Sequence, residues 1–514
     1  MKRYSDLEYL RLSKWNKFTY KLASFFYAIP QALKNAGIGI GRFFKGVGVG
    51  IANEFKDIGS TFKNGDWKTK GSFFVMGLGS MTRGQILRGI LFLLFEIVFI
   101  VYMALPTGGV YWLGKLRTLG DHGVEKVTEV VYGQTVEKII PGDNSFRILL
   151  YGVLTLFFIV AFIYTWRLNV KQNKIAEDII RSGKPLRSGK EDLRSLVDDQ
   201  FHKTLLALPL TGILVFTVMP IVFMVLVAFT NYDGAHDGAN NLFTWVGLDN
   251  FNTMLNWNSG NKAYSAAFGE ILTWTLIWAF FATFTNYFLG MFVAMMINKK
   301  GIALKKVWRT ILVLTIAIPQ FISLLYVSKM FAKNGLINLS LINLGWIQPG
   351  QELPFWEDPT WARITVILIN IWIGIPYLML IATGILMNIP QDLYESSRID
   401  GANAWQQFSK ITLPYMLFIT GPYLLTSFTG NMNNFNVIFL LTGGGPTNAQ
   451  LSTAAGSVGH TDLLITWLFK ITTGAESQYY MASVVGIMVF VVVAVISLVV
   501  YNVLPSIKNE EDFQ

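Results

Sequence analysis

The sequence predicts an all-α integral membrane protein with about eight transmembrane helices. Charged residues make up only 14% of the 514 residues, whereas soluble domains carry about 25%. Hydrophobic residues make up 52%, and many of them form uncharged runs of the roughly 20 residues that a helix needs to cross a bilayer. The runs are continuous, as in "FVVVAVISLVV" (490–500), whereas the strands of a membrane barrel alternate in polarity. An ordinary soluble enzyme is therefore excluded.

Eight apolar runs account for the predicted spans. Seven of them meet the length requirement well: 86–106, 147–166, 204–229, 271–297, 307–327, 364–388 and 482–504. The eighth, 415–430, is shorter and rich in Ser, Thr and Gly. We count it because residues 425–442 continue largely uncharged, and because an even number of spans suits the distribution of charge.

The basic residues indicate which loops are cytoplasmic, since Lys and Arg accumulate on that side of a membrane. Residues 1–85 contain 14 of them, residues 167–203 contain nine and residues 298–306 contain four. Loops 230–270 and 431–481 contain one each. We therefore expect a multi-pass membrane protein with both termini and loop 389–414 in the cytoplasm. The net charge of +10 follows from this topology and does not indicate nucleic-acid binding.

The chain divides into five predicted segments. They are a basic amphipathic cytoplasmic extension (1–85), a transmembrane hairpin (86–166), a charged cytoplasmic linker (167–203), a six-helix core (204–504) and a cytoplasmic tail (505–514). In the extension, residues 12–29 mix lysines with aromatics and predict a helix on the membrane surface, with its basic side toward anionic lipid. Residues 37–50 contain too many glycines for a confident helix.

Several kinds of chemistry are absent or disfavoured. The chain has no Cys and four scattered His, so we expect no metal site. It has no Walker A sequence, so it cannot hydrolyse ATP through a P-loop, and we expect no catalytic residue and no cofactor. Glu96 within the first span predicts a buried hydrogen bond to a neighbouring helix, with a proton relay as the less favoured alternative. The "LTGGGP" stretch (441–446) lacks a Lys and predicts an external or re-entrant turn.

Loop 389–414 predicts a helix–turn–helix knob exposed to the cytosol. Pro390 opens the loop, and Asp392 with Glu395 resembles a capping box. Gly401 is the predicted break, and Pro414 is predicted to end the second helix. Trp405, Phe408 and Ile411 recur at helical spacing. Two amphipathic turns of this kind suit the groove of another protein, although an ordinary connecting loop is the alternative.

The same loop is similar to the Glu-Ala-Ala motif of ABC importer permeases. In that family the loop is a coupling helix seated in a cleft of the ATPase subunit. Two serines stand here in place of the two alanines, a small-for-small change. The matching residues are Glu395, Ser396, Ser397, Asp400, Gly401, Ala402, Ile411, Leu413 and Pro414.

Other stretches resemble MalF-type oligosaccharide permeases in particular. They are "NMNNFNVIFLLTGGGPTNA" (431–449), "TNYDG" (230–234) and "VGLDNF" (246–251). The resemblance covers roughly 204–504 and implies a six-helix type I ABC importer core, to which an N-terminal two-helix hairpin is added. It implies alternating-access import of an oligosaccharide, maltodextrin-like or another plant or host glycan. The implied partners are a second homologous permease (MalG-like), an ATPase dimer that carries ATP and Mg²⁺, and an extracellular or lipid-anchored sugar-binding protein.

Two polar stretches within spans predict a sugar site, because sugars need aromatic faces together with amides or hydroxyls. They are "WIGIPYLM" (372–379) and "SFTGNMNNF" (427–435), and in the second Ser427, Asn431 and Asn434 share a helix face. The resemblance implies a site of Ile373, Gly374, Tyr377, Ser427, Gly430, Asn431 and Asn434. Gly430 replaces an aromatic residue of the maltose-type permease, which widens the pocket and disfavours maltose itself. The alternative is that the amides only bond neighbouring helices.

Three rival functions predict different residues. An ion-coupled secondary transporter predicts paired intramembrane acids, and the spans contain essentially Glu96 alone. A membrane-bound enzyme predicts clustered His, Asp or Glu at a membrane face. An ABC permease for glycerol-phosphate or an acidic sugar predicts Arg or Lys near the site, and neither polar stretch contains one.

Overall fold

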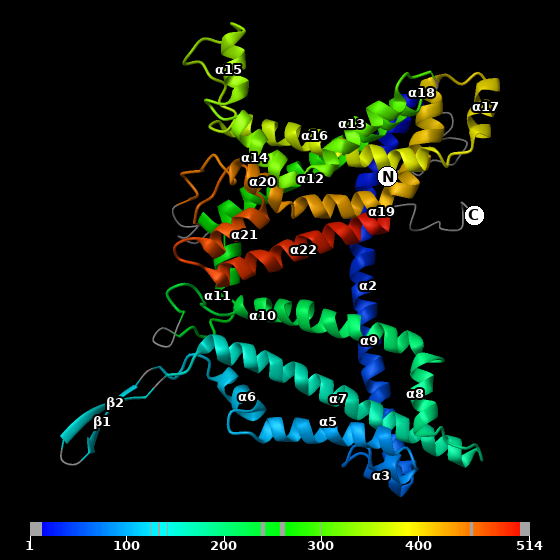
Figure 1. Cartoon of the computed structure of the whole chain (residues 1–514), viewed down its shortest axis with the longest axis vertical. Coiled ribbons are helices and arrows are strands. Elements are labelled where there is room, and N and C mark those ends of the chain that lie inside the picture. The colour runs from blue at the N-terminus through cyan, green and yellow to red at the C-terminus, as the bar shows by residue number, and fades with distance from the viewer. Residues whose placement is uncertain are drawn as a thin grey trace. The chain divides into compact units, whose positions relative to one another are not determined.

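The computed structural model describes residues 13–123, 125–131, 134–140, 142–237, 242–256, 263–299, 301–452 and 456–503. The predicted tail, 505–514, and the first 12 residues of the extension lie outside this part. The described chain is predominantly helical (Figure 1). It forms two compact units, one of residues 40–250 and 478–483, the other of the remaining residues. Each unit is described separately below.

The unit of residues 40–250 contains the first three predicted spans. They appear as α5 (Ile86–Ala104), as the first part of α7 (Ser145–Arg181), and as α9 (Phe201–Ile213) continued by a π-helical turn, η1 (Leu214–Val218), and α10 (Met219–Val227). Its core includes Leu119, Ile148, Leu149, Val227 and Phe243. The other helices are the second half of α2 (Lys14–Asn64), then α3 (Trp67–Gly71), α4 (Leu78–Thr82), α6 (Gly109–Arg117) and α8 (Gly189–Val197).

A β-hairpin in this unit was not foreseen by the all-α prediction. Strand β1 (Glu125–Val131) pairs antiparallel with β2 (Gln134–Ile140), and Glu125 lies opposite Ile140. Both segments are rich in Val, Thr and Ile, which favour strands, and two residues separate them, as in a tight hairpin. The hairpin lies between predicted spans, so the spans themselves remain helical.

The second unit contains the predicted core from residue 251 onward. Helix α12 (Ala263–Asn298) packs along α16 (Pro359–Leu386) (Figure 1). The two helices share a buried cluster that includes Trp278, Val366 and Ile369. The other helices here are α13 (Lys305–Ala317), α14 (Gln320–Met330), α15 (Leu336–Asn343), α17 (Gln391–Ile399), α18 (Ala404–Gln407), α19 (Leu413–Met432), α20 (Phe435–Thr442), α21 (Leu464–Thr473) and most of α22 (Tyr479–Val503). Helix α11 (Asp249–Leu255) connects the two units.

The eight predicted spans are all present, but one of them is not straight. Seven helical stretches among the described residues are long and apolar enough to cross a membrane. The predicted span 307–327 is instead the pair α13 and α14, bent by 92°. Pro319 explains the break, because proline lacks the N–H that would bond four residues back and keeps Ile318 out of helical geometry. Ile318 accordingly has an extended ψ of 126°.

Helix α2 runs through the glycine-rich stretch 37–50, which the sequence left doubtful as a helix. The expectation rested on the low helix propensity of glycine. It did not take into account the apolar residues that recur at helical spacing between the glycines. Trp15 in the predicted surface helix 12–29 is well exposed.

Candidate functional site

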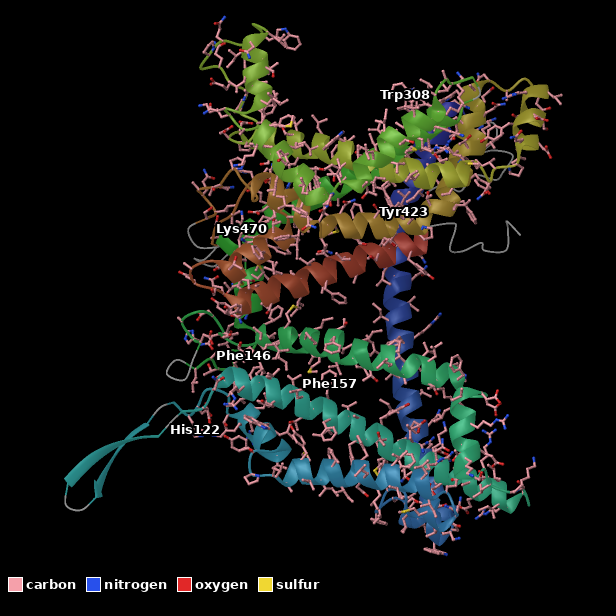
Figure 2. The ribbon with its side chains drawn as sticks, viewed as in Figure 1. His122, Phe146, Phe157, Trp308, Tyr423 and Lys470 are labelled. Carbon is pink, nitrogen blue, oxygen red and sulfur yellow. The ribbon has the colours of Figure 1, made fainter. Side chains whose placement is uncertain are left out.

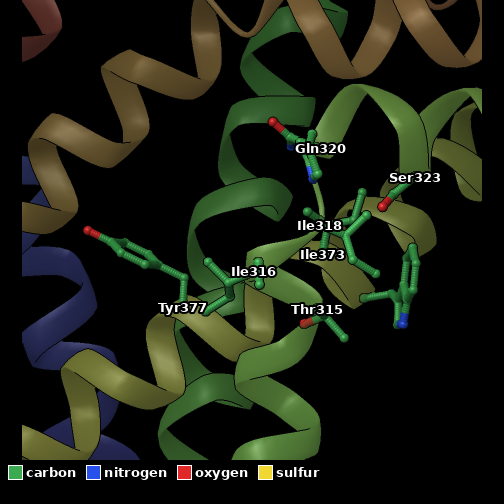
Figure 3. Close-up of a pocket in the computed structure, with 10 residues that line it drawn as sticks. Thr315, Ile316, Ile318, Gln320, Ser323, Ile373 and Tyr377 are labelled. Atoms are coloured by element: carbon green, nitrogen blue, oxygen red, sulfur yellow. The ribbon is translucent and has the colours of Figure 1, made fainter.

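A cavity of about 380 Å³ lies beside the break between α13 and α14. Its wall combines this break with one face of α16 (Figure 3). The lining residues are Thr315, Ile316, Ala317, Ile318, Pro319, Gln320, Ser323, Trp372, Ile373 and Tyr377. None of these ten is charged. A helix break also leaves backbone groups without intrahelical partners, so the cavity combines aromatic and apolar surface with hydrogen-bonding capacity.

Two of the predicted sugar residues on α16 line this cavity, and the third does not. Ile373 and the half-exposed Tyr377 face it. Gly374 lies against α12, where an added Cβ would stand 2.2 Å from Nδ2 of Asn286. The contribution of Gly374 is therefore the close approach of α16 to α12. Asn286 in turn donates from Nδ2 to the backbone oxygen of Asn370 at 3.4 Å.

The predicted amides near the end of α19 bond neighbouring helices. Asn431 donates from Nδ2 to Oγ1 of Thr283 on α12 at 3.0 Å, and its backbone oxygen accepts from Nε1 of Trp278 at 3.1 Å. Asn434 donates to Oδ1 of Asn431 at 3.4 Å and caps α20 by accepting from the N–H of Val437. In this conformation the two amides have the geometry of the structural alternative.

Ser427 belongs to a different polar group, which the sequence did not identify. It lies one helical turn after Tyr423 on α19, and both side chains are half-buried. The side chain of Tyr423 also lies near Tyr377 of α16 (Tyr423 is labelled in Figure 2). Gly430 has no heavy atom within 4 Å of an added Cβ. The position of a first side-chain atom at residue 430 is therefore unobstructed.

The cavity residues that sequence reasoning missed come mainly from the helix break. Gln320 and Ser323 begin α14, and Thr315 lies near the end of α13. The available signal was Pro319 in the middle of an otherwise uninterrupted apolar run. An internal proline in a span indicates a kink or break, and a break at membrane depth requires polar partners.

The loop between α16 and α19 has the predicted helix–turn–helix form. Helix α17 ends at Ile399, Gly401 adopts a φ of +76°, and α18 starts at Ala404. Apolar side chains at the tip are highly exposed: 87% for Ile399 and 71% for Trp405. Glu395, Ser396 and Asp400 are also exposed.

The two helices of this loop are joined by hydrogen bonds. Gln407 donates from Nε2 to Oγ of Ser397 at 2.8 Å and to the backbone oxygen of Tyr394 at 3.1 Å. The hydroxyl of Tyr394 bonds Oγ1 of Thr412 at 2.9 Å, just before α19. Ala402 donates its N–H to the backbone oxygen of Ser397. Ser397, which stands in place of a motif alanine, is therefore a structural link between α17 and α18.

Two local predictions for this loop are wrong. The N-cap of α17 is Pro390 without a side-chain bond, and the capping box is formed instead by Asn403 and Gln406 before α18. Pro414 does not end the helix, since α18 continues through a π-helical turn, η2 (Phe408–Thr412), into α19. Pro414 directly follows η2, and a local π-helical adjustment of this kind accommodates a proline within a continuous helix. Ile411 and Leu413 are half-buried along this continuous run.

A second cavity, of about 360 Å³, opens beside α17. Unlike the first, it contains charged groups. The lining residues are Asn298, Leu386, Met387, Ile389, Gln391, Tyr394, Glu395 and Arg398. Glu395 of the predicted coupling motif therefore borders a polar recess at the base of the loop.

Two side features also have structural explanations. The "LTGGGP" stretch wraps around Asp462, which is fully buried and paired with Lys470 at 2.6 Å (Lys470 is labelled in Figure 2). Glu96 is buried and accepts a hydrogen bond from the N–H of Met76 at 2.8 Å. The donor lies in the segment between α3 and α4, whereas the sequence predicted a hydrogen bond to a neighbouring span.

Comparison with known proteins identifies the family. The inner membrane component of binding-protein-dependent transport systems matches residues 286–509. The maltodextrin transport system permease protein MalC of Streptococcus pneumoniae is 34% identical over 445 residues, which are 85% of this chain and 95% of MalC. The chain belongs to this permease family.

Other members of the family show similar or narrower matches. The galactooligosaccharides transport system permease protein GanP of Bacillus subtilis is 32% identical over 85% of this chain and 97% of its own length. The maltose/maltodextrin permease protein MalF of Escherichia coli is 34% identical over 45% of this chain and 44% of its own length. The family match includes α13 to α20, so both the intramembrane cavity and the α16–α19 loop of this permease lie inside it.

Proposed function

We propose that this permease moves an uncharged oligosaccharide across the cell membrane by alternating access, driven by ATP hydrolysis on a separate subunit. Relatives that match over 85% of the chain are named for maltodextrin and galactooligosaccharide transport. Both cargoes are neutral sugar chains, so shared ancestry favours a cargo of that class.

The observation that carries the proposal is the character of the intramembrane cavity. Trp372 and Tyr377 offer ring faces, while Gln320 and Ser323 offer groups that can bond sugar hydroxyls. Its lining has no cation, which an acidic sugar or glycerol-phosphate would require to offset its charge inside a membrane.

The α16–α19 loop is the proposed contact with the ATPase. Its exposed Ile399 and Trp405 suit a groove of a partner protein. Movement of α17 would reach the start of α19 through the bonds of Tyr394 to Gln407 and Thr412. Because α19 also carries Tyr423 and Ser427, one continuous helix connects the docking loop to the side chains near Tyr377.

The remaining parts of the assembly follow from the proposed mechanism. Both termini and the α16–α19 loop lie in the cytoplasm, consistent with the basic residues of the segments on that side. A second, homologous permease completes the pathway, and an external binding protein delivers the sugar. ATP and Mg²⁺ bind to the ATPase dimer, and this chain itself carries out no covalent chemistry.

The proposal is tested in proteoliposomes that contain this chain with its partner permease, ATPase and binding protein. We expect ATP-dependent uptake of labelled neutral oligosaccharides that stops when the ATPase is omitted. Uptake that continues without the ATPase, driven by a proton or sodium gradient, would show a secondary transporter. Uptake of glycerol-phosphate but of no neutral sugar would overturn the proposed cargo.

The cavity itself is tested by Tyr377→Ala. We expect the KM for the sugar to rise roughly 3- to 10-fold, equivalent to the about 0.5–1.5 kcal/mol of an aromatic contact. The matched control is Tyr326→Ala, because Tyr326 is an exposed tyrosine of α14 that does not line the cavity. Equal KM values for the two variants would place the sugar elsewhere.

A further inference from the structure

The second half of α2 carries an exposed apolar stripe. Phe44, Ile51, Phe55 and Phe62 follow one another at intervals of seven, four and seven residues, which places them on one face of a helix. Phe44 is 67% exposed and Phe55 is 70% exposed. A continuous apolar surface of this kind indicates an interaction site.

A basic row runs along the adjoining face of the same helix. Lys45, Lys56 and Lys63 are separated by eleven and seven residues, so they too share one direction, about 100° around the helix axis from the stripe. Arg42 extends this row toward the N-terminus. All four side chains are exposed.

A third face fixes this part of α2 to α7. Arg167 pairs with Glu54 at 2.5 Å and with Asp57 at 2.6 Å, and Lys174 pairs with Asp57 at 2.5 Å. The hydrogen bond from Lys174 lowers the pKa of Asp57 below its ordinary value, so the carboxylate is ionised at neutral pH. Arg167 directly follows the apolar part of α7, so α2 is attached at the depth where that span ends.

Aromatic contacts place the end of the stripe at the same depth. The ring of Phe62 packs edge-on against Phe73 at 5.2 Å, and Phe73 packs against Trp166 at 5.7 Å. Trp166 donates from Nε1 to the backbone oxygen of Phe73 at 3.0 Å. Tryptophans at the ends of spans mark the boundary between hydrocarbon and headgroups.

We propose that residues 40–63 of α2 form an interfacial helix that binds the anionic surface of the bilayer. The apolar stripe inserts just below the headgroups, and the basic row contacts lipid phosphates. The ion pairs with Arg167 and Lys174 hold the helix at this depth. This function is separate from transport of the cargo, and it extends the lipid-facing region beyond the predicted segment 12–29.

The absence of cysteine in the native sequence allows a direct test with single spin labels. Phe55→Cys lies on the stripe, while Val49→Cys is the matched control, because Val49 is 51% exposed and lies about 120° around the helix axis from Phe55, on the side of the basic row. Both variants are labelled in the complete transporter, in nanodiscs of phosphatidylglycerol and phosphatidylcholine. We expect the Phe55 label to be more accessible to oxygen and the Val49 label to be more accessible to a water-soluble nickel complex.

Equal accessibility of both labels to the nickel complex would overturn the proposal. Protection of the Phe55 label from both reagents, found only when the ATPase is present, would show that a protein covers the stripe and would also overturn it.

The choice of anionic lipid is tested by reversing the basic row with Lys45→Glu, Lys56→Glu and Lys63→Glu together. The matched control reverses Lys184, Lys190 and Arg194 in the linker, which changes the net charge equally. We expect the first variant to retain about threefold less phosphatidylglycerol after extraction than the control, as measured by mass spectrometry. Equal retention would show that the row does not bind anionic lipid.

Discussion

Two connecting segments within one unit of the molecule differ sharply in what they leave exposed. The α20–α21 loop (443–463) encloses its own charge, since Asp462 is fully buried and bonded to Lys470, the N–H of Gly459 and the hydroxyl of Thr466. The α16–α19 loop (387–412) leaves Ile399 87% exposed. The buried charge of the first loop has its bonding partners within the chain, whereas the second loop has an apolar tip that needs a partner. Comparing which charges are buried and which apolar side chains are exposed in this way distinguishes structural loops from docking loops.

The largest effect is expected at the enclosed charge. Lys470→Ala leaves the Asp462 carboxylate buried without its counter-ion, and breaking a buried pair in this way costs about 3–5 kcal/mol. We expect a lower thermal unfolding midpoint of the purified complex. The double change Asp462→Leu with Lys470→Met removes both charges and should recover most of the loss. If Lys470→Ala unfolded at the same temperature as the wild type, the interpretation that Lys470 neutralises a buried charge would be contradicted.

Two glycines with similar backbone angles provide the next test of the comparison. Gly444 has a φ of +87°, and an added Cβ would stand 1.9 Å from Oδ1 of Asp462. Gly401 has a φ of +76° with nothing within 4 Å. We expect Gly444→Ala to cost about 2 kcal/mol or more, from strain together with overlap, and Gly401→Ala to cost about 1 kcal/mol from strain alone. Chemical denaturation of both variants measures the difference, and equal losses would refute it.

A third prediction concerns the exposed loop tip. Trp405→Ala should change stability by less than about 0.5 kcal/mol, because the side chain makes few contacts in the chain, but weaken ATPase binding roughly tenfold, as loss of an interface tryptophan does. Trp346→Ala is the matched control, since Trp346 is 75% exposed in the segment after α15. Binding is measured by titrating the ATPase onto the membrane complex. Equal affinities for both variants would exclude Trp405 from the interface.

The sequence predicted the spans better than the side-chain partners. Apolar run length located the seven helical stretches long enough to cross a membrane and the bent pair α13 and α14, because crossing a bilayer requires that length irrespective of packing. It did not predict the 92° bend at Pro319, although the proline was visible, because apolarity alone does not distinguish a straight span from a broken one. Tyr423 was missed for another reason. Its closeness to Tyr377 depends on how α19 packs against α16, and the spacing of residues within one helix does not indicate how two helices pack.

The motif serines show where local sequence is ambiguous. "Glu-Ser-Ser" was interpreted as a small-for-small replacement that permits close packing. Ser396 is exposed, whereas Ser397 accepts a hydrogen bond from Gln407, ten residues later and across the Gly401 turn. The pairing depends on the geometry of the turn, which residue size does not specify.

The smallest effect is predicted for a change of Ser397. It tests whether the docking loop consists of an exposed tip that binds the partner and a base that only holds the loop together. Ser397→Ala removes one hydrogen bond between α17 and α18, which is worth about 0.5–1.5 kcal/mol. Because Gln407 keeps its bond to the backbone oxygen of Tyr394, the loop should stay folded. We expect ATPase binding to change little, while hydrogen exchange of the α17 amides accelerates several-fold, within the roughly tenfold that 1.4 kcal/mol allows. Ser396→Ala is the control, with exchange as in the wild type. If Ser397→Ala instead lowered ATPase affinity as much as Trp405→Ala, the base of the loop would belong to the docking surface, and the division between a self-contained base and an exposed tip would fail.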